Sequence, residues 1–453
     1  MSAKVSYFFV PTKYFCNFVV KNDEKGVFRV MQVTVCPPLE LRGRVDLPAS
    51  KSISNRALII YALSREGEAF GMDGLGNVSD CDDTRVMVDA LTRNPEVIDI
   101  LAAGTAMRFL SAYLSVSRGT HILTGTERMR HRPIGILVDA LRRLGAEVEY
   151  VENEGFPPLR IKGMRDGKNA ANELALPGDV SSQYISALLM VGPVLKDGLR
   201  LRLTGSIVSR PYIEMTLGIM RRFGAQVAWE SACELTVSPG GYRRVPYCVE
   251  NDWSASSYWY EMVALSPRED AEVVLPNLFE ESLQGDCAVR DIFRHLGVET
   301  EFWRDEDGQE GIRISKKGKP VERLEYDFVN QPDLAQTLVV TCALMGIPFR
   351  FSGLQSLKIK ETDRLVALRT ELRKLGYPIE ETEGRILSWE GERTEAEEHP
   401  VIETYEDHRM AMSLVPACLK VGSVQVNNPE VVSKSYPRFW NDLERMGFSV
   451  KKS

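Results

Sequence analysis

Basic and hydroxyl side chains stand together where one apolar helix is predicted to begin. Lys51, Ser52 and Arg56 lie just before or at the start of an apolar run over residues 57–63. Free backbone N–H groups and the helix dipole attract an anion there, and the two cations add full positive charge. The segment lacks the GxxxxGK[ST] pattern of a P-loop. It therefore predicts a phosphate site of another kind, with a capped helix bearing surface charges as the alternative.

Other predicted helix starts carry a similar combination of residues. They hold Gly104, Arg108, Arg132, Ser181, Ser182, Gln183, Ser209 and Tyr212. A glycine allows a ligand to approach the backbone closely, and neutral donors suit phosphate oxygens and sugar-like hydroxyls. Taken singly, the Gly104 segment is more typical of a helix cap, and the alternative for the Arg132 segment is a solvated basic loop. The hydroxyl-rich segments are as typical of a helix cap as of a binding site.

The second half of the chain adds cations at predicted helix starts, where the helix dipole disfavours them. They are Lys360, Arg364, Arg409 and Lys434. A dianionic ligand would account for this placement. Together with the cations of the first half, these residues predict a cleft that holds more than one polyanion.

Two acidic residues, Asp333 and Glu361, are candidate proton-transfer groups. Asp333 precedes an apolar helix, so by itself it is typical of an N-cap. Neighbouring cations lower the pKa of a carboxyl group and keep it ionised. That environment favours the role of a base for both residues.

The composition is that of a globular protein with an acidic balance. Of 453 residues, 44% are hydrophobic and 26% charged, and 56 basic against 63 acidic residues give a net charge of −7. These values exclude a disordered chain and a global attraction to nucleic acid or anionic membranes. The eight cysteines form no CxxC pair and the five histidines no HExxH motif. We therefore expect reduced thiols, a cytoplasmic location and no metal site.

One pattern recurs along the chain: an amphipathic helix that is closed by glycine and followed by an alternating strand. A weaker sixth copy covers residues 82–100. The closing glycines of the other five are Gly145, Gly224, Gly297, Gly376 and Gly447. The apolar face of the first of these helices is predicted to hold Ile134, Leu137, Val138, Leu141 and Leu144.

Six α/β units in one chain predict two lobes of three units, with a ligand cleft between the lobes. Residues 1–30 precede the strand-like run that begins at Met31. They are expected to be an upstream extension or the result of a misassigned start. No apolar run reaches the ~18 residues that a membrane span requires.

Seven segments, in order, resemble the motifs of the 5-enolpyruvylshikimate-3-phosphate synthases. They are LPASKSISNRAL, AAGTAMRFL, ERMRHRPIG, DVSSQYISALLM, VSRPYIE, KIKETDRL and EDHRMAM. The resemblance runs from about residue 31 to the C-terminus. It implies an α/β fold, a two-lobed inside-out α/β barrel of six βαβαββ repeats, three in each lobe. The first lobe would comprise residues 31–50 and 250–453, and the second residues 51–249.

The resemblance also implies a reaction between phosphoenolpyruvate and shikimate 3-phosphate, without a metal or an organic cofactor. The enolpyruvyl group is transferred to the substrate 5-hydroxyl through a tetrahedral intermediate, and phosphate is released. Asp333 would take the hydroxyl proton, while Lys51 and Glu361 would serve the protonation of C3 and its reversal, with the principal acid left open. The implied partners are these two small molecules alone, with no nucleic acid or membrane, and we expect a monomer.

Residue by residue, the resemblance assigns two overlapping binding sets. The residues for phosphoenolpyruvate are Lys51, Gly104, Arg132, Gln183, Arg364, Arg409 and Lys434. Those for shikimate 3-phosphate are Lys51, Ser52, Arg56, Ser181, Ser182, Gln183, Ser209, Tyr212, Asp333, Ser356 and Lys360.

Three residues depart from the family pattern. Ala102 stands where asparagine is frequent, Phe109 where proline is common, and Ser356 where an asparagine often contacts the substrate. Serine can still donate a hydrogen bond at the last position. Gly104 is retained, which implies sensitivity to glyphosate, a phosphoenolpyruvate mimic in this family.

Three alternative functions fit the sequence less well. A related transferase that acts on UDP-N-acetylglucosamine uses a cysteine before its RPxG-type helix, but no cysteine lies between Cys81 and Cys233. A non-catalytic protein that binds phosphometabolites would need the cations but not Asp333 and Glu361. RNA 3′-phosphate cyclases use a similar fold, but the interleaved aromatic and basic surface of a single-strand binder is not evident.

Overall fold

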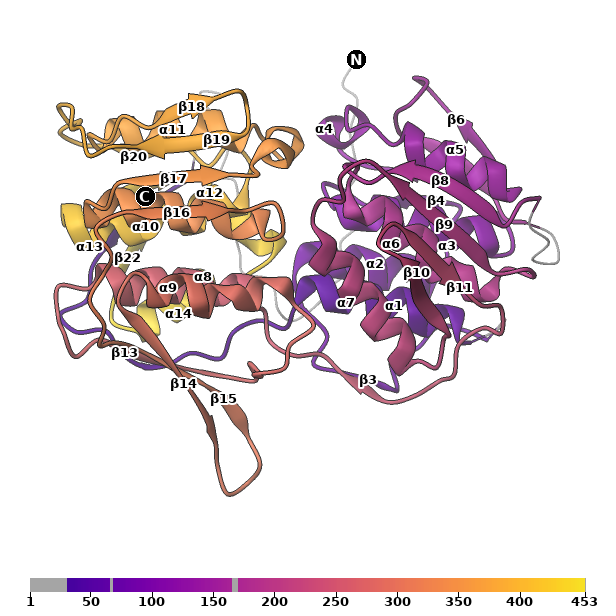
Figure 1. The fold of residues 1–453 in the computed structure, drawn as a ribbon, viewed down its shortest axis with the longest axis horizontal. Coiled ribbons are helices and arrows are strands. Elements are labelled where there is room, and N and C mark those ends of the chain that lie inside the picture. Colours follow the sequence, from indigo (N-terminus) through magenta and orange to yellow (C-terminus); the bar gives the residue numbers. More distant parts are fainter. Residues whose placement is uncertain (1–30, 66–67, 165–169, 453) are drawn as a thin grey trace, which may run out of the picture.

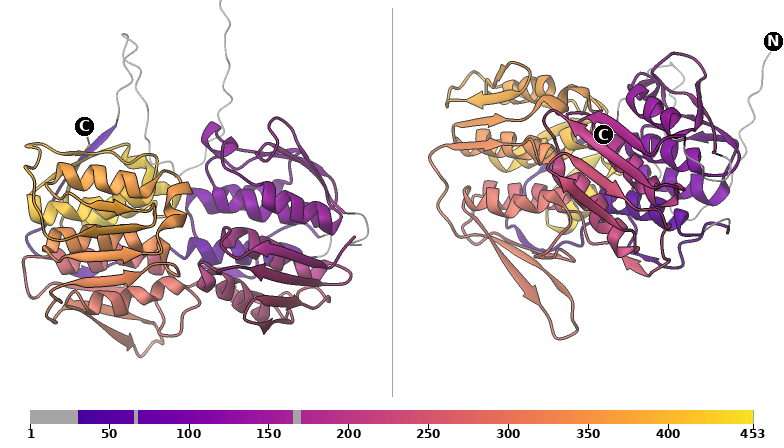
Figure 2. Two further views of the ribbon diagram at one scale, coloured as in Figure 1. Left: turned by 45° about the horizontal axis from the view of Figure 1, so that its top comes forward. Right: turned by 45° about the vertical axis from the view of Figure 1, so that its right-hand side comes forward.

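The computed structural model describes residues 31–65, 68–164 and 170–452, so the expectation for residues 1–30 lies outside it. The described chain has a mixed α/β fold and forms two bodies side by side (Figure 1). One buried hydrophobic cluster takes its residues from 33–47 and 253–448, and the body around it is called the first body. The other cluster takes its residues from 49–249, and the body around it is called the second body. Figure 2 shows the same two bodies from two further directions.

Five four-stranded sheets share one arrangement: two parallel strands, then two antiparallel strands. The second body holds two of these sheets. In strand order, one sheet is β4(Val97–Asp99), β5(Thr120–Thr124), β7(Leu159–Lys162) and β6(Glu147–Tyr150). The other sheet is β8(Glu173–Pro177), β9(Leu199–Thr204), β11(Glu234–Val237) and β10(Val227–Ser231). Along β9, buried leucines alternate with exposed residues, as expected for a sheet with one solvated face. A parallel pair of short strands accompanies these sheets, β3(Leu75–Gly76) and β12(Tyr247–Cys248).

The first body holds the other three sheets. They are β2(Arg42–Arg44), β13(Glu272–Pro276), β15(Glu310–Lys316), β14(Val298–Arg304); β16(Leu324–Asp327), β17(Phe349–Ser352), β19(Ile386–Trp389), β18(Glu380–Thr382); and β20(Val401–Ile402), β21(Val424–Asn427), β1(Gln32–Cys36), β22(Ser449–Lys452). The third sheet pairs the first described strand with the last one. Parallel neighbours cannot be joined by a tight turn, so helices connect them.

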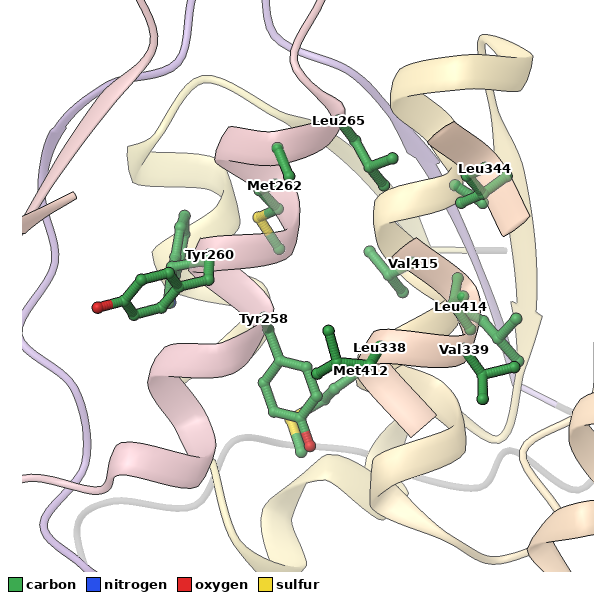
Figure 3. Packing of buried hydrophobic residues seen from close by; sticks show 14 of the residues in the cluster. Tyr258, Tyr260, Met262, Leu265, Leu338, Val339, Leu344, Met412, Leu414 and Val415 are labelled. Carbon is green, nitrogen blue, oxygen red and sulfur yellow. The ribbon is translucent and has the colours of Figure 1, made fainter. Parts of the chain in front are cut away.

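Three helices in each body are buried around nearly their whole circumference. They are α1(Lys51–Leu63), α3(Gly104–Val116) and α6(Ser182–Val191) in one, and α8(Trp253–Leu265), α10(Ala335–Met345) and α12(His408–Leu414) in the other. Such burial favours apolar residues on all sides of a helix, but α1 and α12 also bury charged side chains, among them Arg56 and Arg409. Figure 3 shows side chains of α8, α10 and α12 packed together, with Tyr258, Leu338 and Met412 at the centre of the view.

Six further helices are amphipathic or short and bury one side. They are α2(Asp82–Arg93), α5(Gly135–Leu144), α7(Arg210–Arg222), α9(Val289–Arg294), α11(Arg364–Lys374) and α14(Phe439–Arg445). The remaining helical turns are α4(Glu127–Arg130), α13(Cys418–Val421), η2(Gly192–Val194), η3(Gly285–Ala288), η4(Pro332–Leu334), η5(Gln355–Ile359), η6(Val415–Ala417) and η7(Pro429–Lys434).

The predicted helix endings are confirmed. The five closing glycines have φ values between 85° and 111°, which glycine adopts without the steric cost of a Cβ. In the weaker copy, Asn94 takes this role with φ 44°. The apolar face predicted for the first glycine-closed helix, which is α5 and its N-cap Ile134, is buried at all five positions.

The chain passes between the bodies twice, and the two passages touch. Ala49 and Asn251 form an antiparallel β-bridge at this point. In the part of the chain that the structure describes, seven cysteines are free. No helix within the same residues is both long and apolar enough to cross a bilayer.

Candidate active site

A cavity of about 460 Å³ lies between the two bodies. Every residue that was predicted for the site lines it, except Lys434. From the second body come Lys51, Ser52, Arg56, Gly104, Arg132, Ser181, Ser182, Gln183, Ser209 and Tyr212. From the first body come Asp333, Ser356, Lys360, Glu361, Arg364 and Arg409. Lys434 lies directly behind this wall, because its Nζ donates to Glu361 Oε1 at 2.9 Å.

Arg56 is a buried cation that neutral groups hold in place. Its Nε donates to Thr216 Oγ1 at 2.7 Å, its Nη1 to the Ser52 carbonyl at 2.8 Å and its Nη2 to Ser186 Oγ at 3.3 Å. The guanidinium lies over the ring of Phe109, 5.2 Å from its centroid, a cation–π contact. Burial lowers the pKa of Arg56 to about 10. The group stays charged at neutral pH, and these neutral contacts leave that charge to attract an anion in the cavity.

Lys51 is the first residue of α1 and points toward an acid of α2. Its Nζ lies 3.2 Å from Asp83 Oδ2, and Asp83 is only 4% exposed. Burial by itself lowers the pKa of Lys51, but the Asp83 carboxylate raises it, and the net result is a raised pKa. Lys51 therefore carries a proton that it can donate.

Gly104, the first residue of α3, presents its bare backbone to the Arg132 guanidinium. A Cβ at Gly104 would lie 2.6 Å from Arg132 Nη1. That nitrogen also lies 3.9 Å from Glu361 Oε1, so this ion pair spans the two bodies. Arg108 donates to the carbonyls of Gly104 and Pro133, at 3.1 and 3.2 Å, and so joins the start of α3 to the loop before α5.

The neutral donors of the second body stand at the starts of α6 and α7. Ser181 is the N-cap of α6 and accepts a hydrogen bond from the Gln183 N–H, so it is both a cap and a cavity residue. The Gln183 side chain donates to Thr105 Oγ1 at 3.1 Å. Ser209 has a φ of 55°, and its N–H donates to the Val329 carbonyl of the other body at 2.9 Å.

Asp333 gathers the cations of the first body around one carboxylate. Its Oδ2 accepts from Arg409 Nη2 at 2.8 Å and from the Tyr212 hydroxyl at 3.3 Å. Its Oδ1 accepts from Arg364 Nη1 at 3.3 Å and lies 3.7 Å from Lys360 Nζ. Burial by itself raises the pKa of Asp333, but Arg409, Lys360 and Arg364 lower it well below its usual range. The N-cap alternative is wrong, since Asp333 lies in η4 and α10 is capped by the residue after it.

Arg364 and Glu361 belong to a second group of ion pairs in the site. Arg364 Nε donates to Asp407 Oδ2 at 2.7 Å and its Nη2 to Glu361 Oε2 at 3.0 Å. Burial by itself raises the pKa of Glu361, but Lys434, Arg364 and Arg132 lower it well below its usual range. Glu361 is therefore ionised at neutral pH and can accept a proton.

Two cations that were predicted at helix starts lie elsewhere. Lys434 is the last residue of η7, and Lys360 directly follows η5. The prediction was wrong because a short 3-10 turn precedes each residue, and a cation is favoured at the C-terminal end of a helical turn. Arg364 and Arg409 do lie in the first turns of α11 and α12, where acidic N-cap residues offset the unfavourable dipole.

Two acids that contact site residues, Asp83 and Asp286, were missed by the sequence analysis. Each lies in the first turn of a helical segment, where the helix dipole alone explains an acid. The Lys51–Asp83 and Tyr212–Asp286 contacts join residues 32 and 74 positions apart. No spacing rule connects residues so distant in the sequence, so nothing in the pattern marked them.

His408 is a buried neutral group in the cavity wall. It is 2% exposed, and within the described residues neither ring nitrogen has a hydrogen-bond partner. Burial, followed by the charges of Lys51 and Arg409, lowers the pKa of His408 well below its usual range. Residues 31–65, 68–164 and 170–452 contain no group of three or more His, Cys, Asp or Glu side chains placed to hold a metal ion.

Comparison with known proteins places this chain in a family. A family model described as EPSP synthase (3-phosphoshikimate 1-carboxyvinyltransferase) matches residues 35–93 and 91–443. A 3-phosphoshikimate 1-carboxyvinyltransferase of Bacteroides fragilis (strain YCH46) is 58% identical over 421 residues, which are 93% of this chain and 99% of the relative. Its namesake in Sulfurovum sp. (strain NBC37-1) is 35% identical over 442 residues, 91% of this chain and 98% of the relative.

The fold agrees with solved structures. An EPSP synthase from Acinetobacter baumannii superposes with a TM-score of 0.73 at 21% sequence identity, over 94% of this chain and 100% of that chain. A second structure of that enzyme gives a TM-score of 0.72. With the family model covering most of the sequence and a 58% identical relative covering 93% of it, this chain belongs to the EPSP synthase family of 3-phosphoshikimate 1-carboxyvinyltransferases.

Proposed function

We propose that the cavity between the two bodies is where this chain transfers the enolpyruvyl group of phosphoenolpyruvate to the 5-hydroxyl of shikimate 3-phosphate. The main support is that Arg364, Arg409 and Lys360 all form ion pairs with the Asp333 carboxylate in that cavity. Two phosphorylated substrates need several cations, and the addition step needs a base between them. The site offers both in one place.

Asp333 takes the proton of the substrate hydroxyl as that oxygen bonds to C2 of phosphoenolpyruvate. Its low pKa makes it a weak base while three cations surround it. Phosphate and carboxylate oxygens that bind Arg409, Arg364 and Lys360 share this positive charge, and the pKa of Asp333 then rises. Substrate binding thereby makes the carboxylate a better base.

Lys51 donates the proton to C3, and Glu361 removes one from C3 when phosphate leaves. This division follows from their protonation, because Lys51 has a raised pKa and Glu361 a strongly lowered one. Arg132 Nη1 and Lys434 Nζ lie 3.9 and 2.9 Å from Glu361 Oε1. Proton exchange from Glu361 to Lys51 after each cycle restores these two groups. The proton on Asp333 leaves with the released phosphate, so the reaction is balanced in protons.

The surrounding residues divide into two binding sets. For phosphoenolpyruvate the proposed set is Lys51, Gly104, Arg132, Gln183, Arg364, Arg409 and Lys434. For shikimate 3-phosphate the proposed set is Lys51, Ser52, Arg56, Ser181, Ser182, Gln183, Ser209, Tyr212, Asp333, Ser356 and Lys360. Fixed cations stabilise the charge that develops on the adduct without solvent reorganisation. Glyphosate, a mimic of phosphoenolpyruvate, would compete for the first set.

We further propose that residues 31–50 with 250–453 form one lobe and residues 51–249 the other, each an inside-out α/β barrel of three βαβαββ units. The shared strand order of five sheets supports this division, with the β3–β12 pair as the reduced sheet of a sixth unit. The two hydrophobic clusters support the boundaries. The Arg132–Glu361 ion pair across the cavity supports closure of the lobes on the substrates.

The protein is proposed to act in the cytoplasm as a monomer, with its two substrates as its only partners. The free cysteines among the described residues support a reducing compartment. The acidic net charge of −7 gives no attraction to nucleic acid.

The decisive experiment measures phosphate release with both substrates, with each substrate alone, and with UDP-N-acetylglucosamine in place of shikimate 3-phosphate. Only the pair of phosphoenolpyruvate and shikimate 3-phosphate is expected to release phosphate.

Asp333→Asn should lower kcat by roughly 10²–10⁴-fold, which is the usual contribution of general base catalysis. Asp305→Asn, in the β14–β15 hairpin far from the cavity wall, is the control and should retain wild-type kcat. Wild-type kcat in Asp333→Asn would overturn the assignment of the base.

A further inference from the structure

A second buried carboxylate lies directly behind the proposed base. Asp286, in η3, is 3% exposed and does not line the cavity. The Tyr212 hydroxyl lies between the two acids, 3.3 Å from Asp286 Oδ1 and 3.3 Å from Asp333 Oδ2. Tyr212 comes from α7 of the second body, whereas both acids belong to the first, so this bridge forms at the contact between the bodies.

We propose that Asp286 stores the proton that Asp333 takes from the substrate hydroxyl, and that the proton reaches it through the Tyr212 hydroxyl. Asp286 does not touch the substrate in this role, so it is a positioning residue that acts through Tyr212. The inference rests on the proposed function of Asp333 as the base.

The two carboxylates differ sharply in the charge around them. Asp333 has three cations within 4 Å, whereas the hydrogen-bond partners of Asp286 on side chains are hydroxyls, those of Tyr212 and Ser254. Within the described residues, Asp286 forms no ion pair. A proton is therefore held poorly by Asp333 and well by Asp286.

The groups that face Asp286 reinforce this difference. Burial raises the pKa of Asp286 to about 6, and the nearby Asp333 carboxylate adds to the rise. The titratable or charged groups facing it are Asp333 of η4, Arg409 of α12, Asp252 before α8, Tyr212 of α7, Tyr326 of β16 and Cys287 of η3. Of these, Arg409 opposes the rise, but its guanidinium is bonded to Asp333.

The proton transfers balance in both half-reactions. In the addition, the substrate O–H bond breaks as oxygen bonds to C2, and its proton passes to Asp333. Asp333 gives a proton to the Tyr212 oxygen while Tyr212 gives its own to Asp286, so only Asp286 gains one. In the elimination, the C2–O bond to phosphate breaks, and the stored proton returns along the same path to the departing phosphate.

The test is the pH dependence of kcat in variants of the full chain. In the wild type, kcat should fall on the acidic side with an apparent pKa near 6, because a protonated Asp286 cannot accept. Asp286→Asn should lower kcat by about 10²-fold with little change in either KM, and it should remove this acidic limb. Tyr212→Phe should lower kcat to a similar level, and the double variant should fall no further.

Ser254→Ala is the sharper probe, since it keeps the carboxylate. The Ser254 hydroxyl stabilises the ionised form of Asp286, so its loss should move the acidic limb to higher pH. Asp442→Asn is the matched control: Asp442 is a buried aspartate that accepts from the Tyr436 hydroxyl at 2.9 Å, outside the cavity wall. This variant should keep the wild-type limb even if it is less stable.

The proton store is overturned if Asp286→Asn keeps both kcat and the acidic limb, or if the limb stays in place in Ser254→Ala. Asp333→Asn separates this outcome from a failure of the proposed function. If Asp333→Asn loses turnover while Asp286→Asn keeps its kcat and acidic limb, Asp333 remains the base. Only the role of Asp286 as the proton store is then rejected.

Discussion

Arg409 Nη2 lies 2.8 Å from Asp333 Oδ2, so a cation proposed to bind phosphoenolpyruvate is paired with the carboxylate proposed as the base. A phosphate group that binds Arg409 therefore competes with Asp333. This one contact couples substrate binding to the basicity of the site, because any sharing of the guanidinium frees the carboxylate.

Asp333→Asn is expected to change binding and turnover in opposite directions. Removal of one negative charge leaves Arg409, Arg364 and Lys360 with more unpaired positive charge. Inorganic phosphate should therefore bind several-fold more tightly, although turnover falls. Isothermal titration with inorganic phosphate measures this affinity, and weaker binding in the variant would contradict the coupling. Asp305→Asn, which removes an equal charge far from the cavity, should bind phosphate as the wild type does.

Asp83→Asn should shift the alkaline limb of the kcat profile to lower pH. Burial lowers the pKa of Lys51 and the Asp83 carboxylate raises it above its ordinary value, so loss of that charge lowers it. Lys51 then loses its proton at a lower pH and fails earlier as the acid. Asp82→Asn is the control, because it removes the same charge from the neighbouring position. The Asp82 carboxylate accepts a hydrogen bond from Ser433 of the other body, whereas Lys51 pairs with Asp83. An unmoved alkaline limb in Asp83→Asn would show that Lys51 is not the proton donor.

Gly104→Ala should raise KM for phosphoenolpyruvate more than it lowers kcat. The new Cβ would lie 2.6 Å from Arg132 Nη1, so the guanidinium must move. A tenfold rise in KM corresponds to a loss of about 1.4 kcal/mol of binding free energy. Inhibition by glyphosate should weaken in parallel. Gly135→Ala is the control, because its Cβ would meet only ordinary contacts at 3.6 Å, and equal kinetic effects of the two variants would refute the steric argument.

His408→Gln should make the protein less sensitive to mild acid. Burial keeps His408 neutral in the folded chain, whereas the unfolded chain protonates it below about pH 6.5. The unfolded state then binds more protons, so wild-type stability falls as pH drops, by up to about 1.4 kcal/mol per pH unit from this residue. Urea unfolding at pH 7, 6 and 5 should show a smaller loss in the variant. His399→Gln, at an exposed position, should follow the wild type, and a His408→Gln curve parallel to the wild type would refute the prediction.

Local patterns in the sequence determined the helix endings and selected most of the residues that line the cavity. Gly145, Gly224 and Gly297 end their helices because a left-handed residue is required there, a property that the sequence carries within one turn. Lys51, Arg56 and Arg364 could be selected because cations beside apolar helix starts are unusual. Such signals act over a few residues, and they hold wherever the segment lies in the fold.

The tertiary structure alone decided which charges meet. Asp333 receives Arg409 from 76 positions away and Tyr212 from 121 positions away, and Asp286 is joined to Tyr212 only where the two bodies touch. Lys360 and Lys434 were misplaced for the same reason, because a 3-10 turn is set by how the loop packs. A side-chain contact depends on distances that two separate hydrophobic cores fix. The order of residues along the chain contains no measure of those distances.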